Sequence, residues 1–177
     1  MDKLRAALNR VDQSVLDRIG TFRLVERRKS FVAFRDITAL GGDAFLIVGG
    51  LLIASMQAVS MGAAAAFRIV LFLLLARLAG WLLKALFKRT RPLEPVKGVE
   101  TFTSSFPSIH TMNAFCIFFA LAFVGTGGSS SAALAVSAVF AAMVGSTRLV
   151  FRVHWPSDVL AGYLSGLGLS LAGSIFL

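Results

Sequence analysis

Long apolar runs limit most strongly how this 177-residue chain can fold. An α-helix rises about 1.5 Å per residue, so roughly 20 apolar residues cross about 30 Å of bilayer hydrocarbon. Five stretches approach or reach this length: residues 44–60, 62–86, 107–125, 131–148 and 156–177. Charged residues make up only 15% of the chain, which is typical of a membrane protein. We therefore predict an all-α, polytopic transmembrane helix bundle of about five spans.

The N-terminal region, residues 1–43, differs from the remainder, residues 44–177, which form the predicted transmembrane domain. Apolar residues recur at steps of three and four between residues 3 and 24, at Leu4, Leu8, Val11, Val15, Ile19 and Phe22. This spacing predicts an amphipathic helix, too polar to span, that lies at the membrane surface or on the ends of the bundle. A partner-binding helix is the alternative. Val25 to Asp43 is polar and basic, and Gly41-Gly42 is expected to break the helix before the first span. That span is short, so either Thr38 to Asp43 extend it or it tilts little.

The chain carries a net charge of +9, with 18 basic and 9 acidic residues. In a soluble protein this excess would suggest a nucleic-acid partner. Here the basic residues flank the apolar runs, as topology and anionic headgroups require, and no aromatic-basic nucleic-acid surface is seen. The predicted partner is the bilayer, with no nucleic acid.

Glycines recur in the last apolar run, at Gly162, Gly166, Gly168 and Gly173. Small residues on one side of a membrane helix let neighbouring backbones approach closely. The pattern predicts tight packing of this helix in the bundle.

Polar clusters lie at the ends of the spans. Lys84 to Pro92 closes the second span, residues 107–110 open the third, Arg148 closes the fourth, and His154 to Asp158 opens the fifth. Because successive spans alternate in direction, all four clusters face one side of the membrane. Convergence of distant polar segments is the geometric requirement for a site.

The first cluster supplies cations. Lys84 and Arg91 are seven residues apart, so both can project from one helix face if the helix persists to Thr90. Pro92 disfavours helix at Arg91 and is expected to end it there. The adjacent Lys88 and Arg89 are expected to contact lipid headgroups.

The second cluster is an anion site at a helix start. Pro107 suits the first turn of a helix, because its missing N–H is not needed there. Ser108, Ile109 and His110 would then present free backbone N–H groups and the positive end of the helix dipole.

The third cluster holds an oriented imidazole. His154 and Asp158 are four residues apart near a helix start, so the carboxylate can hold one ring nitrogen and leave the other to act as nucleophile or base. Arg148 offers a planar fork for oxygen ligands. One carboxylate and two histidines surrounded by Lys and Arg would repel a divalent cation, so no metal is expected. Cations, a helix N-terminus, an oriented nucleophile and a histidine acid together favour phosphoryl transfer.

These motifs resemble those of the type 2 phosphatidic acid phosphatase family of membrane lipid phosphatases. Lys84-(six)-Arg91-Pro92, Pro107-Ser108-Ile109-His110 and Arg148-(five)-His154-(three)-Asp158 follow its three motifs in order, and the resemblance covers about residues 44–177. It implies that His154 forms a phosphohistidine, Asp158 orients it and His110 protonates the leaving alcohol. It also implies no metal or cofactor, and phosphate binding by Lys84, Arg91, Ser108, Ile109 and Arg148.

Two residues depart from the family pattern. Ile109 replaces a glycine whose bare backbone lets phosphate come close; isoleucine keeps the N–H but adds bulk and disfavours positive φ. Thr147 replaces the serine usual before the arginine. Both changes bear on substrate fit more than on reaction type.

The distribution of basic residues predicts the sidedness. Nine precede the first span, seven more lie at the site end of the later spans, and only Arg68 and Arg77 remain. The positive-inside rule then places the active site on the cytoplasmic face of a bacterial inner membrane, although three of these cations belong to the site itself. In the family that the motifs resemble, the active sites of many relatives with an additional N-terminal span face outward.

The side of the membrane limits the substrate. A cytoplasmic site favours phosphatidylglycerophosphate, phosphatidate or a polyprenyl-linked sugar phosphate, and an outward site undecaprenyl diphosphate or a lipid A phosphate. A lipid phosphotransferase remains an alternative, as does a catalytically silent lipid-phosphate-binding protein, which Ile109 motivates. The sequence carries no signal for oligomeric state.

Overall fold

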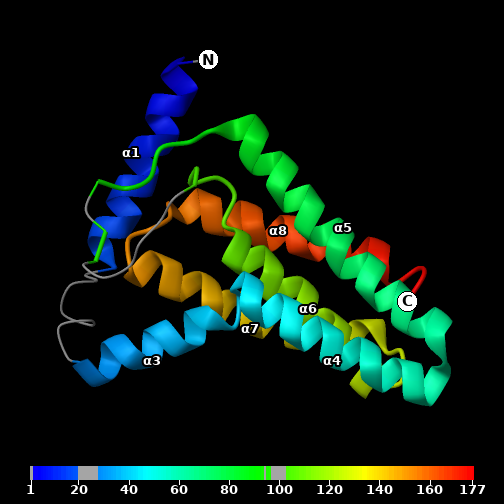
Figure 1. Cartoon of the computed structure of the whole chain (residues 1–177). Coiled ribbons are helices and arrows are strands. Elements are labelled where there is room, and N and C mark those ends of the chain that lie inside the picture. The colour runs from blue at the N-terminus through cyan, green and yellow to red at the C-terminus, as the bar shows by residue number, and fades with distance from the viewer. Residues whose placement is uncertain (1, 20–27, 94, 97–102) are drawn as a thin grey trace.

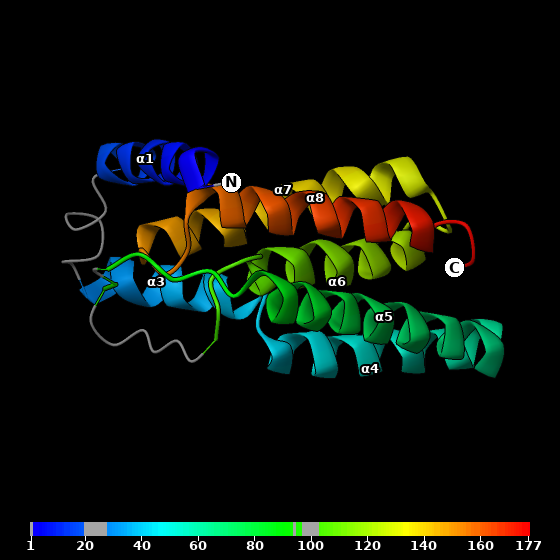
Figure 2. The same ribbon diagram turned by 90° about the horizontal axis from the view of Figure 1, so that it is seen from above.

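The computed structural model describes residues 2–19, 28–93, 95–96 and 103–177. Within these residues it contains seven α-helices and no strand: α1 (Asp2–Arg18), α3 (Arg28–Ala39), α4 (Asp43–Met61), α5 (Ala63–Phe87), α6 (Ile109–Gly125), α7 (Ser130–Val150) and α8 (Pro156–Gly173). Helices α4 to α8 run up and down beside one another (Figures 1 and 2). The predicted all-α bundle is confirmed.

Helices α4, α5 and α7 are each long and apolar enough to cross a membrane, and α6 is a shorter apolar helix. The predicted spans agree with α4 to α7 within two residues at each end. Helix α8 begins where predicted but ends at Gly173, because the last residues form turns whose N–H groups bond to the carbonyls of Ser170, Ala172 and Gly173. The chain is an integral membrane protein.

Helix α6 is the centre of the bundle. It packs against α4, α5, α7 and α8, and residues 111–120 are all buried. A helix enclosed in this way is apolar on every side, as its sequence is. Two glycines of α8 allow the approach: a Cβ on Gly162 would lie 2.3 Å from the Ser108 carbonyl oxygen, and one on Gly166 would lie 2.5 Å from the Phe115 Cβ. Gly168, by contrast, faces open space.

Glycine turns separate the first elements. Gly41 and Gly42 lie in the turn between α3 and α4, as predicted, so α4 is not extended by residues 38–42. Gly62 joins α4 to α5 with φ of 88°, which glycine adopts readily. From this turn α4 and α5 diverge toward the opposite end of the bundle (Figure 1).

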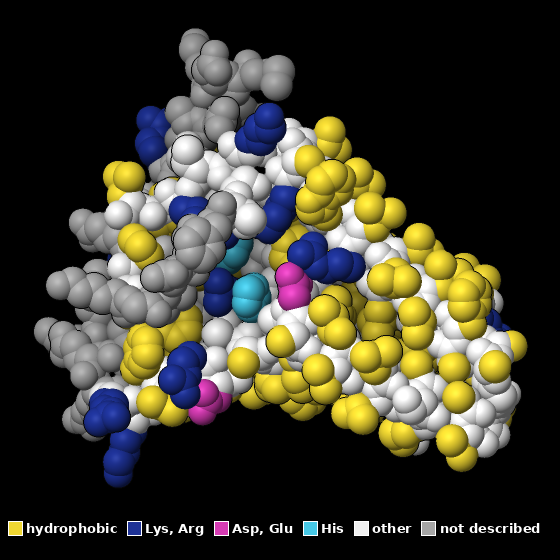
Figure 3. All heavy atoms as spheres, viewed as in Figure 1, with side chains coloured by type: hydrophobic (Ala, Val, Ile, Leu, Met, Phe, Trp, Pro, Cys, Tyr) yellow, Lys and Arg dark blue, Asp and Glu magenta, His cyan; other side chains and the backbone are white. Residues whose placement is uncertain are grey.

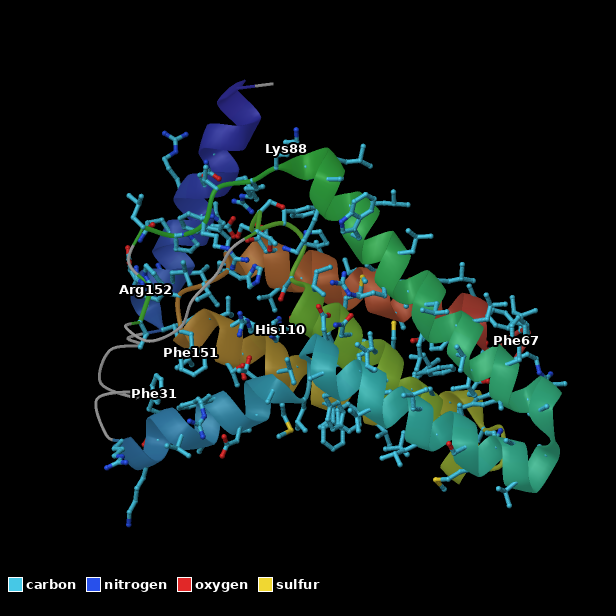
Figure 4. All side chains as sticks on the ribbon, viewed as in Figure 1. Phe31, Phe67, Lys88, His110, Phe151 and Arg152 are labelled. Atoms are coloured by element: carbon cyan, nitrogen blue, oxygen red, sulfur yellow. The ribbon has the colours of Figure 1, made fainter. Side chains whose placement is uncertain are left out.

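Helix α3 was not predicted, although Phe31, Phe34 and Ile37 recur at three-residue steps, which is the pattern of an amphipathic helix; the polar and basic composition around them obscured it. It packs against α7 at the end of the bundle opposite Gly62. The rings of Phe31 and Phe151 meet edge to face, with their centroids 5.6 Å apart (Figure 4). The aromatic side of this amphipathic helix thus packs on the end of α7.

Helix α1 lies across this same end of the bundle (Figure 1). It ends at Arg18, and residues 20–24 of the predicted helix lie outside the described part of the chain. Val11 is 62% exposed, and Leu8 and Val15 are exposed as well, whereas Asp12 and Leu16 are buried. The helix therefore packs on the bundle through Asp12 and Leu16, and leaves Leu8, Val11 and Val15 outward, where a bilayer surface can receive them.

Candidate active site

A cavity of about 260 Å³ opens at the end of the bundle where α5 stops and α6 begins. It is lined by Asp43, Arg77, Trp81, Lys84, Arg91, Thr103, Ile109, His110, Arg148 and His154. Histidine and basic side chains are visible in this hollow, and the helices that extend away from it present a largely apolar surface (Figure 3). The predicted convergence of the span ends is confirmed, and both histidines reach one cavity (His110 is labelled in Figure 4).

His154 follows α7 on a short segment and is 2% exposed. Its Nδ1 lies 3.7 Å from Asp158 Oδ2, which is too long for a hydrogen bond, and its Nε2 lies 3.4 Å from Arg91 Nη1. The ring thus stands between a carboxylate and the cavity. Burial lowers the pKa of His154 to about 4, helped by Arg148 and Arg91 and opposed by Asp158. A neutral imidazole with one nitrogen toward the cavity is the arrangement that a nucleophile or base requires.

Asp158 is fully buried in the first turn of α8, where several donors hold it. Its Oδ2 accepts the Trp155 backbone N–H at 2.9 Å and the Ser105 hydroxyl, and its Oδ1 accepts Arg89 Nη1 at 2.8 Å. Its backbone carbonyl accepts the Ser108 N–H at 2.9 Å. The bond to Trp155 is half of a capping box, so the helix start itself fixes this carboxylate.

Arg89 was predicted to contact lipid headgroups, and this prediction is wrong. Its side chain is 11% exposed and forms ion pairs with Asp158 and Asp12. The guanidinium also lies 5.5 Å from the centre of the Trp155 ring. Lys88, next to it in sequence, does fit the prediction: it is exposed and points away from the cavity (Figure 4).

Ser105 was also missed by sequence reasoning. It precedes the second motif in a polar run, Thr103-Ser104-Ser105, and that run is the only sequence signal that could have drawn attention to it. Thr103 lines the cavity, and Ser105 is buried behind it on Asp158.

Lys84 and Arg91 reach the cavity by different routes. Helix α5 ends at Phe87, so it does not persist to Thr90, and the two side chains do not share a helix face. Lys84 projects from the last turn and donates to the Ser104 carbonyl. Arg91 lies on the following extended segment and donates to the carbonyls of Val153 at 2.6 Å and Thr103 at 2.9 Å.

Arg148 completes the cations of the cavity from the last turn of α7. Its Nη1 donates to the Thr38 hydroxyl at 2.8 Å, while its buried Nε has no hydrogen-bond partner. Within the described part of the chain, neither Lys84, Arg91 nor Arg148 forms an ion pair with a carboxylate. The cavity is therefore positively charged and suited to a multiply charged anion.

Helix α6 begins at Ile109, not at Pro107, and Ser108 is its N-cap residue. Ser108 is buried, does not line the cavity, and accepts a hydrogen bond from the Thr111 hydroxyl at 2.9 Å. Its backbone N–H donates to the backbone carbonyl of Asp158. The N–H groups of Ile109 and His110 lie in the first turn, where helices have no internal acceptor for them. Both residues line the cavity, so their N–H groups are candidates for binding an anion there.

The two departures from the family pattern have simple structural settings. The Ile109 side chain points toward Gly80 of α5: a Cβ on Gly80 would lie 2.5 Å from Ile109 Cδ1. Ile109 has helical backbone geometry, so no positive φ is needed, and its bulk lies between two helices. Thr147 is buried and donates to the Val144 carbonyl at 2.7 Å, away from the cavity lining.

The fold and the cavity define an integral membrane protein with a cation-lined cavity at one end of its helix bundle and an imidazole beside a buried carboxylate. The family model of the PAP2 superfamily matches residues 65–176. This match covers more than half of the chain, and the chain belongs to the PAP2 superfamily.

Two relatives are similar to it. Phosphatidylglycerophosphatase B of Bacillus subtilis (strain 168) is 33% identical over 98 residues, which are 51% of this chain and 47% of that protein. The chain thus spans about half the length of the curated relative it matches. The crystal structure of the first transmembrane PAP2 type phosphatidylglycerolphosphate phosphatase from Bacillus subtilis matches with a TM-score of 0.78 at 24% identity, over 99% of this chain and 87% of that one. This likeness supports the fold.

Proposed function

We propose that this protein is a metal-independent membrane lipid phosphatase in which His154 is the nucleophile. One observation carries the proposal. The imidazole of His154 is buried and neutral between Asp158 and a cavity lined by Lys84, Arg91 and Arg148, none of which forms an ion pair with a carboxylate in the described residues. Such a cavity holds a phosphate dianion beside a ring nitrogen that can attack it.

The proposed reaction has two steps. Nε2 of His154 attacks phosphorus, the N–P bond forms, the P–O bond to the alcohol breaks, and His110 gives its proton to the leaving oxygen. Water then attacks the phosphohistidine and His110 takes a proton, which releases phosphate and restores both histidines. Lys84, Arg91, Arg148 and the N–H of Ile109 stabilise the transferring phosphoryl group, and Ser108 supports the helix start behind it.

An apolar groove supports a lipid as the alcohol. The groove, about 360 Å³, lies between α4 and α5 and shares Asp43 and Arg77 with the cavity. Those two side chains form an ion pair, 2.9 Å between Oδ2 and Nη2, at the junction. Beyond them the lining is apolar or glycine: Leu46, Ile47, Gly50, Leu51, Val70, Leu73 and Leu74. A phosphate in the cavity can therefore carry an acyl or prenyl chain that remains among membrane helices.

The printed name of the curated relative makes phosphatidylglycerophosphate the first substrate to test. Phosphatidate and polyprenyl-linked phosphates follow, because each joins a phosphate to an apolar chain. The basic residues around the site support a cytoplasmic orientation in a bacterial inner membrane.

The test is phosphate release from a panel of these lipids by purified protein in detergent with EDTA. We expect turnover by the wild type, none by His154→Ala, and full turnover by Lys88→Ala, whose side chain points away from the cavity. No release from any lipid phosphate, or undiminished release by His154→Ala, would contradict the proposal.

Two further measurements separate the alternatives. Mass spectrometry of the products distinguishes free phosphate from a phosphorylated acceptor, which a phosphotransferase would make. Tight vanadate binding without turnover would instead indicate a silent lipid-phosphate-binding protein. Substrate supplied to one side of oriented vesicles reports the orientation.

A further inference from the structure

We infer that Asp12 of α1 is a positioning residue for the Asp158–His154 pair and that it acts through Arg89. The kinetic part of this inference rests on the proposed function. Its geometric part does not, because it concerns only how the His154 ring is held.

Asp12 is 2% exposed and has three hydrogen bonds to the site end of the bundle. Its Oδ1 accepts the Ser157 N–H at 2.9 Å, and its Oδ2 accepts the Ser157 hydroxyl at 2.5 Å and Arg89 Nη2 at 2.6 Å. Ser157 is the second residue of α8. Asp12 therefore caps, from another helix, the turn that carries Asp158.

Arg89 connects the two carboxylates. Its Nη1 donates to Asp158 Oδ1 at 2.8 Å and to the Ser157 hydroxyl at 2.6 Å, and its Nη2 donates to Asp12 and, at 2.8 Å, to Asn9. A guanidinium is planar, so fixing one edge fixes the other. The Asp12 contact thereby sets the plane in which Arg89 holds Asp158 Oδ1, and the remaining Oδ2 faces His154.

The way α1 packs favours this role over simple bundle packing. Leu16 is the apolar anchor of the helix, but Leu8, Val11 and Val15 are exposed, whereas the charged Asp12 is buried and hydrogen-bonded to Ser157 of α8. The helix also lies outside residues 65–176, which the family model matches. Helix α1 therefore places a second carboxylate, Asp12, behind the site from a segment outside the part of the chain that the family model matches.

The first experiment compares two aspartates of the same helix. Asp12→Asn removes the charge from Arg89 but keeps an amide oxygen for Ser157, and Asp17→Asn removes only the ion pair with Arg152, 3.2 Å long and more exposed. We expect Asp12→Asn to lower kcat by about 10- to 100-fold, as loss of an outer partner of a site does. The KM and the affinity for vanadate should stay at their wild-type values, because Asp12 does not line the cavity.

Controls separate positioning from stability. Asp17→Asn should keep kcat near the wild-type value, and Asp12→Glu, which restores the charge, should give a kcat between those of Asp12→Asn and the wild type. The inference is overturned if Asp12→Asn retains the wild-type kcat. It is also overturned if kcat falls in both asparagine variants in proportion to their loss in Tm.

The second experiment needs no activity. The chain has only two histidines, so ¹⁵N-histidine labelling resolves both rings, and His154→Asn assigns them. We expect Asp12→Asn to reduce the fraction of His154 protonated at Nδ1, the nitrogen that faces Asp158. An unchanged tautomer fraction would overturn the inference, whereas an inactive wild type with a changed fraction would refute the proposed function alone.

Discussion

His154 separates two regions of opposite electrostatic design. On the carboxylate side, Asp158 and Asp12 are paired with Arg89. On the cation side, Lys84, Arg91 and Arg148 face the cavity, and among the described residues no carboxylate forms an ion pair with them.

The difference shows which charged groups are paired within the protein and which are left for a ligand. On the carboxylate side, both carboxylates are paired within the protein, so Asp158 is already in place beside His154 before substrate arrives. On the cation side, repulsion between like charges lowers the stability of the empty protein, and a bound phosphate would raise it again. Variants of the two sides should therefore have opposite effects on stability, although both reduce activity.

The largest effect is expected for Asp158→Asn on the carboxylate side. The amide cannot orient the imidazole or balance Arg89, so kcat should fall on the order of 10³- to 10⁴-fold, and Tm should fall because Arg89 loses one of its two carboxylate partners. Phosphate release and a thermal melt in detergent measure both. Asp36→Asn, at an exposed pair with Arg35, is the control and should change neither. A Tm at or above the wild-type value would refute the view that this side stabilises the fold.

Arg148→Met, on the cation side, should lower kcat/KM by about 10²- to 10³-fold, as loss of one transition-state donor does. Its Tm should stay the same or rise, because a like charge and a buried Nε without a partner are both removed. The same two assays apply, with exposed Arg35→Met as the control. If Tm falls as far as in Asp158→Asn, the contrast between the two sides is wrong.

The pH dependence tests the position of His154 between the two sides. Its pKa is about 4 in the folded protein, against about 6.5 for an ordinary histidine, so acid favours the unfolded state. Its contribution, about 3 kcal/mol at most, is complete above pH 6.5 and lost as pH falls through 4. Histidine ¹⁵N titration should give that midpoint, and the loss of Tm between pH 7 and 5 should shrink in His154→Asn. A titration midpoint of His154 near 6.5 would contradict the lowered pKa.

The smallest effect concerns the start of α6. Gly80→Ala places a Cβ 2.5 Å from Ile109 Cδ1 and from Met112 Cε, and both are flexible side-chain ends that can move. A displaced Ile109 narrows the cavity, so KM should rise within about tenfold while kcat changes little. Adding Ile109→Gly should restore the wild-type KM. Substrate kinetics of both variants decide this, and a double variant no better than Gly80→Ala would refute the pairing.

The site composition could be predicted because the signals are local. Run lengths locate α4 to α7 within two residues, and alternation of spans then places Lys84, Arg91, His110, Arg148 and His154 at one end. These inferences need only the hydrophobicity of each run and the alternating direction of successive spans, and both can be read from residues that are neighbours in sequence.

The support of the site could not be predicted in the same way. Arg89 and Lys88 are adjacent cations with the same local context, yet one is buried on Asp158 and the other is exposed. Asp12 lies 146 positions before Asp158, and no periodicity links them.

By itself, the sequence determined a helical membrane protein, the order of its spans and the chemistry gathered at their ends, because hydrophobic runs and motif spacing act within single segments. The tertiary structure alone decided which carboxylates balance Arg89, which way Ile109 points and which face of α1 is buried. Each of these depends on the neighbour that another segment supplies, and burial assigns different partners to residues that look alike in sequence.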